Sequence, residues 1–131
     1  MNTRQPVRSM TFISLAITAL LLGSQASHAA GDPKRGADTF AQECAECHSV
    51  KEGKNKKGPS LFAVVGRKAG SIADFVYSEP MKLSAISWSP DKIDAYLAHP
   101  KQVVQGGKMK YDGLPDEKDR ADVIAYLSTL R

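Results

Sequence analysis

Apolar positions at helical spacing predict a first helix shortly after residue 30. Asp32 followed by Pro33 is typical of a helix start, because aspartate caps the first free amides and proline suits the first helical position. The apolar face that follows consists of Ala37, Phe40, Ala41 and Cys44. We expect this helix to run from about Pro33 to the cysteine pair.

Two more helices are predicted near the end of the chain. Ser89-Pro90 repeats the cap and proline, Ile93 and Leu97 share a face, and Pro100 is expected to end this helix. Pro115-Asp116 precedes the last helix. Its apolar positions at 3.6-residue spacing are Ala121, Ile124, Leu127 and Leu130.

The segments between these helices show no sustained periodicity. Residues 49–61 are rich in lysine and glycine, residues 62–88 favour short helical turns, and residues 101–114 are irregular around Gly106-Gly107. No internal repeat, hairpin dipeptide or alternating strand occurs. The predicted fold class is therefore all-α, with about three to five short helices joined by long loops.

The first part of the chain has the pattern of an export signal. Arg4 and Arg8 precede the apolar run FISLAITALLL, and Ser27-His28-Ala29 offers small residues for cleavage after Ala29. An uncleaved membrane anchor is the alternative, although the run is shorter than the roughly 20 residues that a spanning helix needs. We expect residues 1–29 to be a cleaved secretory signal peptide. Residues 30–131 then form one domain in the periplasm or another extracytoplasmic compartment, without stable membrane insertion.

The charge balance gives no indication of nucleic-acid binding. The formal net charge is +4, and it falls to +2 when Arg4 and Arg8 leave with the signal. A nucleic-acid-binding domain usually carries a much stronger basic excess. We therefore expect protein partners and no nucleic acid.

The chemistry is concentrated in the segment Cys44-Ala45-Glu46-Cys47-His48, which matches the C-x-x-C-H pattern of c-type haem attachment. Two thiols at this spacing can reach the two vinyl groups of one porphyrin edge, and the next histidine can then reach the iron. A disulfide across so short a loop would constrain little of the unfolded chain. The motif predicts one covalent haem c with its iron, bound through two thioethers to Cys44 and Cys47 and by His48.

Two other uses of the cysteine pair are less consistent with the sequence. A thioredoxin-like C-x-x-C site occurs in a βαβ context, and none is predicted here. A structural zinc site usually needs four ligands, and the mature chain reaches four cysteines and histidines only with the distant His99.

The second axial ligand determines whether the iron position is open or closed. An open position permits ligand or peroxide chemistry, whereas a second protein ligand favours electron transfer. Met81, Met109 and His99 are the candidates. Met109 is favoured, because a methionine after Gly106-Gly107 and between two lysines is poorly placed for a hydrophobic core.

From Gly31 to Leu130 the chain resembles class I cytochromes c, of the mitochondrial and bacterial c2 kind. The resemblance begins with GDPKRGADTFAQECAECHSV (residues 31–50). The further motifs, in family order, are KKGPSL (56–61), Gly66-Arg67, Phe75-x-Tyr77-Ser78, Trp88, Tyr96-Leu97, Pro100, Lys108-Met109 and DVIAYL (122–127). It implies the small cytochrome c fold, in which the terminal helices cross and the loops wrap around one haem.

The resemblance also implies roles for individual residues. Met109 would be the second axial ligand opposite His48, with Tyr96 near it. Pro59 would lie beside the carbonyl that binds the ring proton of His48. The residues that would reach the haem propionates are Arg67, Tyr77 and Trp88. Where the terminal helices cross, the residues in contact would be Gly36, Phe40, Tyr126 and Leu127.

The chain departs from the family pattern at two places. Gln105-Gly106-Gly107 precedes the Lys108-Met109 pair, where the family often has Pro-Gly-Thr. The resemblance therefore implies that a propionate hydrogen bond from the threonine is lost and that the two glycines loosen the loop. Pro80-Met81 replaces a common Ala-Asn, and Met81 is expected to form an apolar wall near the haem. We hypothesise that the Met109–iron bond is weaker than is usual in the family, which alkali sensitivity of that bond would test.

The expected function is that of an electron carrier, not an enzyme. Seven lysines should border the exposed haem edge and steer acidic redox partners, such as a membrane complex as donor and an oxidase or reductase as acceptor. These are Lys51, Lys54, Lys56, Lys57, Lys101, Lys108 and Lys110. The alternatives are a haem enzyme or ligand sensor with a displaceable sixth ligand, or a redox subunit of a larger enzyme. A monomer is expected.

Overall fold

The computed structural model describes residues 1–2 and 30–131, so the expected signal peptide and its cleavage site lie almost entirely outside the described residues. The helices in the described part are α1 (Pro33–Glu43), α2 (Glu79–Leu83), α3 (Pro90–Ala98), α4 (Pro100–Val103) and α5 (Glu117–Ser128). No strand occurs there beyond an isolated bridge between Lys68 and Ser87. The all-α prediction is confirmed. No described helix has both the length and the apolar character needed to cross a bilayer.

The predicted helix starts are confirmed by their caps. The Asp32 carboxylate accepts hydrogen bonds from the amides of Lys34 and Arg35 at the start of α1. Ser89 caps α3 and Asp116 caps α5 in the same way. Each cap satisfies amides that have no partner within their own helix.

The structure adds to the prediction for Pro100 and places Leu130 outside the last helix. Pro100 follows the end of α3, as expected, but it also begins α4, since proline lacks only an amide that the first turn leaves free. Leu130 lies beyond α5, which ends at Ser128. Within residues 62–88, the single short helix α2 begins after Ser78, whose hydroxyl accepts from the amide of Met81.

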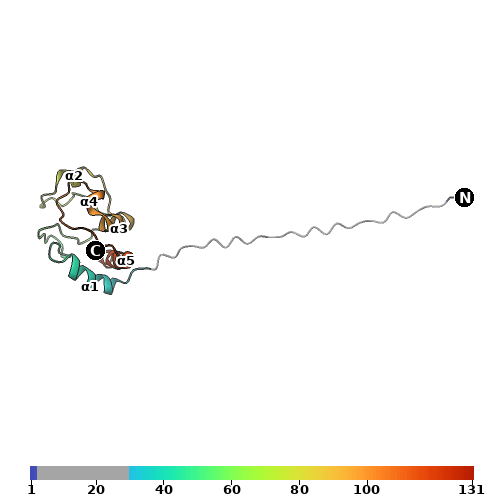
Figure 1. The fold of residues 1–131 in the computed structure, drawn as a ribbon, viewed down its shortest axis with the longest axis horizontal. Coiled ribbons are helices and arrows are strands. Elements are labelled where there is room, and N and C mark those ends of the chain that lie inside the picture. Colours follow the sequence, from blue (N-terminus) through green and yellow to red (C-terminus); the bar gives the residue numbers. More distant parts are fainter. Residues whose placement is uncertain (3–29) are drawn as a thin grey trace.

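The terminal helices α1 and α5 pack directly against each other (Figure 1). A Cβ atom on Gly36 would lie 1.9 Å from the carbonyl oxygen of Asp122, so only glycine permits this close approach. The rings of Phe40 and Tyr126 lie 5.7 Å apart between their centroids. The contact expected where the terminal helices cross is therefore confirmed for these residues. The buried core comprises Phe40, Val64, Trp88, Ile93, Leu114, Val123 and Leu127.

Candidate haem site

The turn after α1 holds both cysteines and the histidine of the C-x-x-C-H motif. Cys44 ends the helix, and its carbonyl accepts hydrogen bonds from the amides of Cys47 (3.1 Å) and His48 (2.9 Å). Both thiols are free and partly buried. Burial, assisted by the neighbouring Glu43 carboxylate, raises the pKa of the Cys44 thiol to about 11. The turn therefore presents two unpaired thiols beside one imidazole.

The His48 ring is fixed by the loop that follows it. Its Nδ1 atom lies 2.8 Å from the carbonyl oxygen of Pro59. A carbonyl can only accept, so Nδ1 carries the proton and the Nε2 lone pair is available for a metal. A Cβ on Gly58 would lie 2.4 Å from the ring atom Cε1, so a side chain there would collide with the imidazole. Burial is the main cause that lowers the pKa of His48 and favours the neutral ring.

Arg67 is a half-buried cation without a carboxylate partner among the described residues. Its two terminal nitrogens donate to the carbonyls of Phe62 and Ser60, each at 2.8 Å. Burial lowers its pKa, whereas the nearby Tyr77 has a small opposing effect. The amide of the buried Trp88 donates to the Arg67 carbonyl at 2.9 Å. The structure thus places the three residues expected at the propionates in one neighbourhood.

Met109 is held against the rest of the site by an aromatic pair. The Tyr96 hydroxyl donates to the Met109 Sδ atom at 3.9 Å. The Tyr96 ring packs on Trp88 with 5.0 Å between ring centroids. Tyr96 therefore lies beside Met109, in the position that the resemblance implies.

These groups fit a haem c. The free thiols have the spacing of thioether attachment, and one imidazole nitrogen is left for the iron. A methionine thioether is a known partner of histidine in cytochromes c. The half-buried guanidinium of Arg67 can balance the negative charge of a propionate. Among the described residues, no group of three His, Cys, Asp or Glu side chains gathers in a way that could hold a metal ion.

A family model, that of cytochrome c, matches residues 33–131. The chain belongs to the cytochrome c family. The cytochrome c2 of Rhodopila globiformis is 48% identical over 101 residues, which cover 77% of this chain and 95% of that protein. The cytochrome c of Theileria annulata is 49% identical over 98 residues, covering 74% of this chain and 84% of that protein. The cytochrome c-type cyt cy of Rhodobacter capsulatus is 46% identical over 100 residues, 76% of this chain and 50% of that protein.

Membership settles the general chemistry of this cytochrome c. Members of the family carry a covalently bound c-type haem with its iron and transfer electrons to redox partners. The chain is accordingly an electron carrier and not an enzyme. Histidine–methionine ligation is consistent with the presence of His48 and Met109.

The two rival ligands of this cytochrome lie in ordinary structural surroundings. His99 is exposed at the junction of α3 and α4. Met81 is partly buried in α2 and packs against the hydrophobic core.

Several contacts around the site could not be anticipated from the sequence. The Tyr111 hydroxyl donates to Glu43 Oε2 at 3.1 Å, across 68 positions of the chain. Two of the seven lysines expected to border the exposed haem edge are paired with acids. Lys57 pairs with Glu46 and Lys101 with Asp112, each at 2.5 Å. No local motif marks such pairs, because they depend on the path of the loops.

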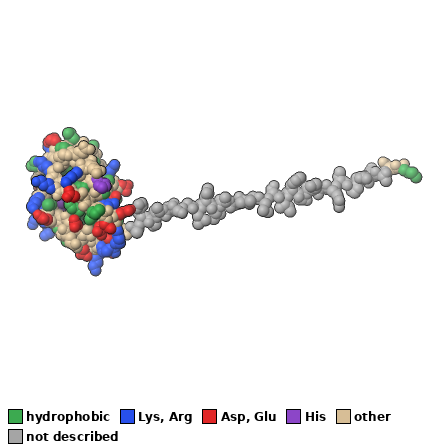
Figure 2. Space-filling model, viewed as in Figure 1, with side chains coloured by type: hydrophobic (Ala, Val, Ile, Leu, Met, Phe, Trp, Pro, Cys, Tyr) green, Lys and Arg blue, Asp and Glu red, His purple; other side chains and the backbone are tan. Residues whose placement is uncertain are grey.

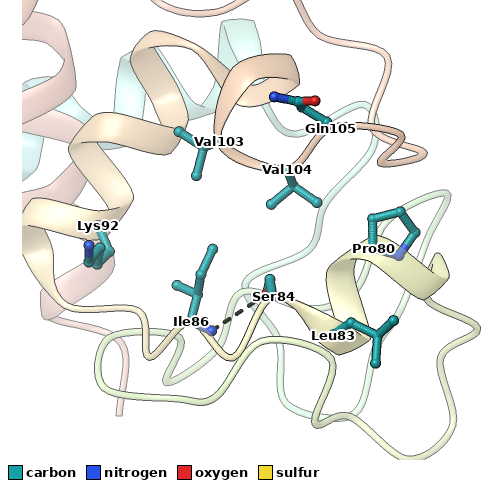
Figure 3. A pocket seen from close by; sticks show the side chains of 8 residues that line it. All are labelled: Pro80, Leu83, Ser84, Ile86, Lys92, Val103, Val104 and Gln105. Carbon is teal, nitrogen blue, oxygen red and sulfur yellow. Dashed lines mark hydrogen bonds between the residues drawn. The ribbon is translucent and has the colours of Figure 1, made fainter.

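A separate open pocket of about 390 Å³ lies between α2, α3 and α4 of the cytochrome (Figure 3). Pro80, Ile86 and Val104 give it apolar walls, and Lys92 lies at its edge. None of the residues expected to contact the haem lines it. A smaller cavity of about 240 Å³ lies beside Arg67.

Proposed function

We propose that the haem is attached through Cys44 and Cys47 and that His48 and Met109 are its axial ligands. The observation that carries this proposal is the 2.8 Å contact between His48 Nδ1 and the Pro59 carbonyl, next to two free cysteines in one turn. It leaves Nε2 as the metal-binding atom of the ring. The haem, once bound, supplies a one-electron iron couple.

The other residues of the site position and stabilise these ligands. Pro59 orients the His48 ring through its carbonyl. Tyr96 donates to the thioether of Met109 and withdraws electron density from the sulfur, which favours reduced iron. Arg67, Tyr77 and Trp88 would hold the haem propionates; the half-buried guanidinium of Arg67 is positioned for this by its bonds to the carbonyls of Phe62 and Ser60.

The visible spectrum of the exported protein tests this assignment. We expect a sharp low-spin reduced spectrum, a weak sulfur-to-iron band when oxidised, and no response to carbon monoxide. Met109→Ala should abolish the sulfur band and allow carbon monoxide to bind. The matched variants Met81→Leu and His99→Ala should retain the band. Prompt carbon monoxide binding by the unaltered protein would instead indicate an open iron and a sensor or enzyme.

We also propose that residues 1–29 direct export and are removed, so that the carrier works in an extracytoplasmic compartment such as the periplasm. The support is the order of basic, apolar and small residues before Ala30. The mass of the secreted holoprotein tests cleavage. A mature chain beginning at Ala30 is expected, and a membrane-bound chain of full length would contradict the proposal.

The docking partners are proposed to be redox proteins with acidic surfaces. Lys108 and Lys110 flank Met109, are exposed, and form no ion pair within the described chain. Acidic side chains lie between the basic ones on the visible face (Figure 2). We expect the positive field of Lys108 and Lys110 to steer such partners at short range.

A further inference from the structure

The hydrogen bond between Tyr111 and Glu43 connects the two segments that carry the proposed haem contacts. Glu43 is the last residue of α1 and immediately precedes Cys44. Tyr111 follows Met109 by two positions. The 3.1 Å bond from the Tyr111 hydroxyl to Glu43 Oε2 therefore joins the attachment segment directly to the ligand segment.

The backbone of the ligand segment is weakly held. Within the described chain, the last backbone hydrogen bond before Met109 is from Gly107 to Val104, and the next is from Leu114 to Leu97. Residues 108–113 form none between themselves or with other backbone groups. Gly106 adopts φ +78°, which favours glycine and offers a point of rotation. Side-chain contacts must therefore hold residues 108–113 in position.

Three side-chain contacts fasten the segment, and they differ in strength. The Lys101–Asp112 pair has side chains that are 65% and 95% exposed, and such pairs contribute little. The Tyr96 contact ends on a thioether, which is a weak acceptor. The Tyr111 contact ends on the carboxylate of Glu43, which is exposed, but the Tyr111 ring is partly buried and packs against the core, so the donor is held in place. Hydrogen bonds to ionised acceptors are the stronger kind.

We propose that the Tyr111–Glu43 hydrogen bond is a latch that limits the release of Met109 from the iron. This inference rests on the proposed ligation by Met109. Tyr111 and Glu43 are positioning residues: they act on the ligand segment as a whole. The rival explanation is that Tyr111 contributes only its packed ring, in which case the hydroxyl is dispensable.

Displacement of Met109 by imidazole tests the latch in the oxidised holoprotein. Loss of the sulfur-to-iron band gives an apparent dissociation constant. Tyr111→Phe keeps the ring and removes the donor, and Glu43→Ala removes the acceptor. Each should lower this constant about three- to tenfold. The dissociation constant of the double variant should be no lower than that of either single variant, because the two substitutions remove the same hydrogen bond. Glu46→Ala is the matched control, since it removes another exposed glutamate near the same cysteines, and its only ion pair in the described chain, with the exposed Lys57, does not involve the ligand segment; it should not change the constant.

A second readout does not depend on ligation. Amide hydrogen exchange of residues 108–113 should become faster in Tyr111→Phe and Glu43→Ala and stay unchanged in Glu46→Ala. Variants with the imidazole constant and exchange rates of the unaltered protein would overturn the latch, and so would additive effects in the double variant. Absence of the sulfur band in the unaltered protein would overturn the Met109 ligation, on which the latch depends. If the exchange rates of residues 108–113 in Tyr111→Phe and Glu43→Ala were also unchanged, the Tyr111–Glu43 bond would be rejected as a contact that holds the segment.

Discussion

The Nδ1 atom of His48 lies 2.8 Å from the carbonyl oxygen of Pro59, and this contact sets the direction of the imidazole. The opposite constraint comes from Gly58, whose missing side chain leaves room for the ring. The His48 ring is therefore positioned by a hydrogen-bond acceptor, the Pro59 carbonyl, and by residue 58, which must be glycine to leave space for the ring. Its orientation depends on the loop as much as on the C-x-x-C-H motif.

Gly58→Ala should disturb His48 ligation more than it disturbs the fold. The new Cβ would lie 2.4 Å from Cε1 and would force the ring away from the Pro59 carbonyl. We expect high-spin features in the spectrum and a lower yield of haem-loaded protein. Gly53→Ala is the control: its φ of 64° makes an alanine strained there, but the added Cβ meets no atom within 4 Å and so cannot displace the His48 ring. A low-spin spectrum in Gly58→Ala with normal yield would contradict the prediction.

The lysines beside Met109 should control the rate of docking. Lys108→Gln combined with Lys110→Gln should slow association with an acidic redox partner several-fold at low salt, and the difference should shrink as salt rises. Lys34→Gln combined with Lys68→Gln removes the same charge from two exposed lysines that form no ion pair in the described chain, and Lys34 lies at the opposite end of α1 from Cys44. Stopped-flow electron transfer at several ionic strengths measures the association rates of both double variants. Equal slowing by the two pairs would show that only net charge matters.

Two alanines occupy backbone conformations that favour glycine. Ala63 has φ 49° and Ala85 has φ 55°, and both are exposed. Replacing either by glycine removes the strain of a Cβ in the left-handed region without loss of burial. We expect each variant to gain about 0.5–1 kcal/mol in the free energy of unfolding, after the higher entropy of unfolded glycine is subtracted. Chemical denaturation measures this.

Ala73→Gly serves as the matched control, because Ala73 is exposed and lies outside the left-handed region. It should lose stability or remain neutral, since only the unfolded chain gains freedom. A loss of stability in both Ala63→Gly and Ala85→Gly would mean that these backbone positions are not strained.

The helix starts were predictable because their signals are local. Asp32, Ser89 and Asp116 each bond amides within three residues, so neighbouring letters of the sequence are sufficient. The same locality explains why the second role of Pro100, as the first residue of α4, was not predicted. A proline is equally compatible with the end of one helix and the first position of the next, and only the loop path decides. Helix α2 has five residues, which is too short for periodicity to reveal.

The site was predictable to a different extent. The motif around Cys44 is contiguous, and the positions of Tyr96 and Met109 follow from the family resemblance. The partners of Arg67 and Tyr111 could not be predicted, because they are backbone carbonyls and a distant glutamate brought close by irregular loops. Loops of this length carry no periodic pattern from which their path can be inferred.

Asp122 is a buried carboxylate whose ionisation stabilises the contact of the terminal helices. Its side chain is 2% exposed and accepts hydrogen bonds from the Asp32 amide, from Arg35 and from Lys118. The hydrogen bonds from Arg35, the largest cause, hold the pKa of Asp122 far below its usual range. Because the folded-state pKa is depressed, this stabilisation is present above the unfolded pKa of about 3.9 and is lost as the pH falls toward the folded value.

Asp122→Asn should therefore destabilise the protein in a pH-dependent manner. At neutral pH we expect a loss of about 1–3 kcal/mol, since the buried Asp122 loses its charge, whereas its partners Arg35 and Lys118 have side chains that are 51% and 65% exposed and remain hydrated. The difference from the unaltered protein should shrink as the pH falls below about 5, where the unfolded aspartate begins to take up its proton while the folded Asp122 stays ionised. Asp38→Asn, an exposed acid on α1, is the control and should leave the free energy of unfolding nearly unchanged. Denaturant titrations of the holoprotein across this pH range measure the effect. A difference that is constant with pH would show that packing at Asp122, and not its charge, stabilises the helix contact.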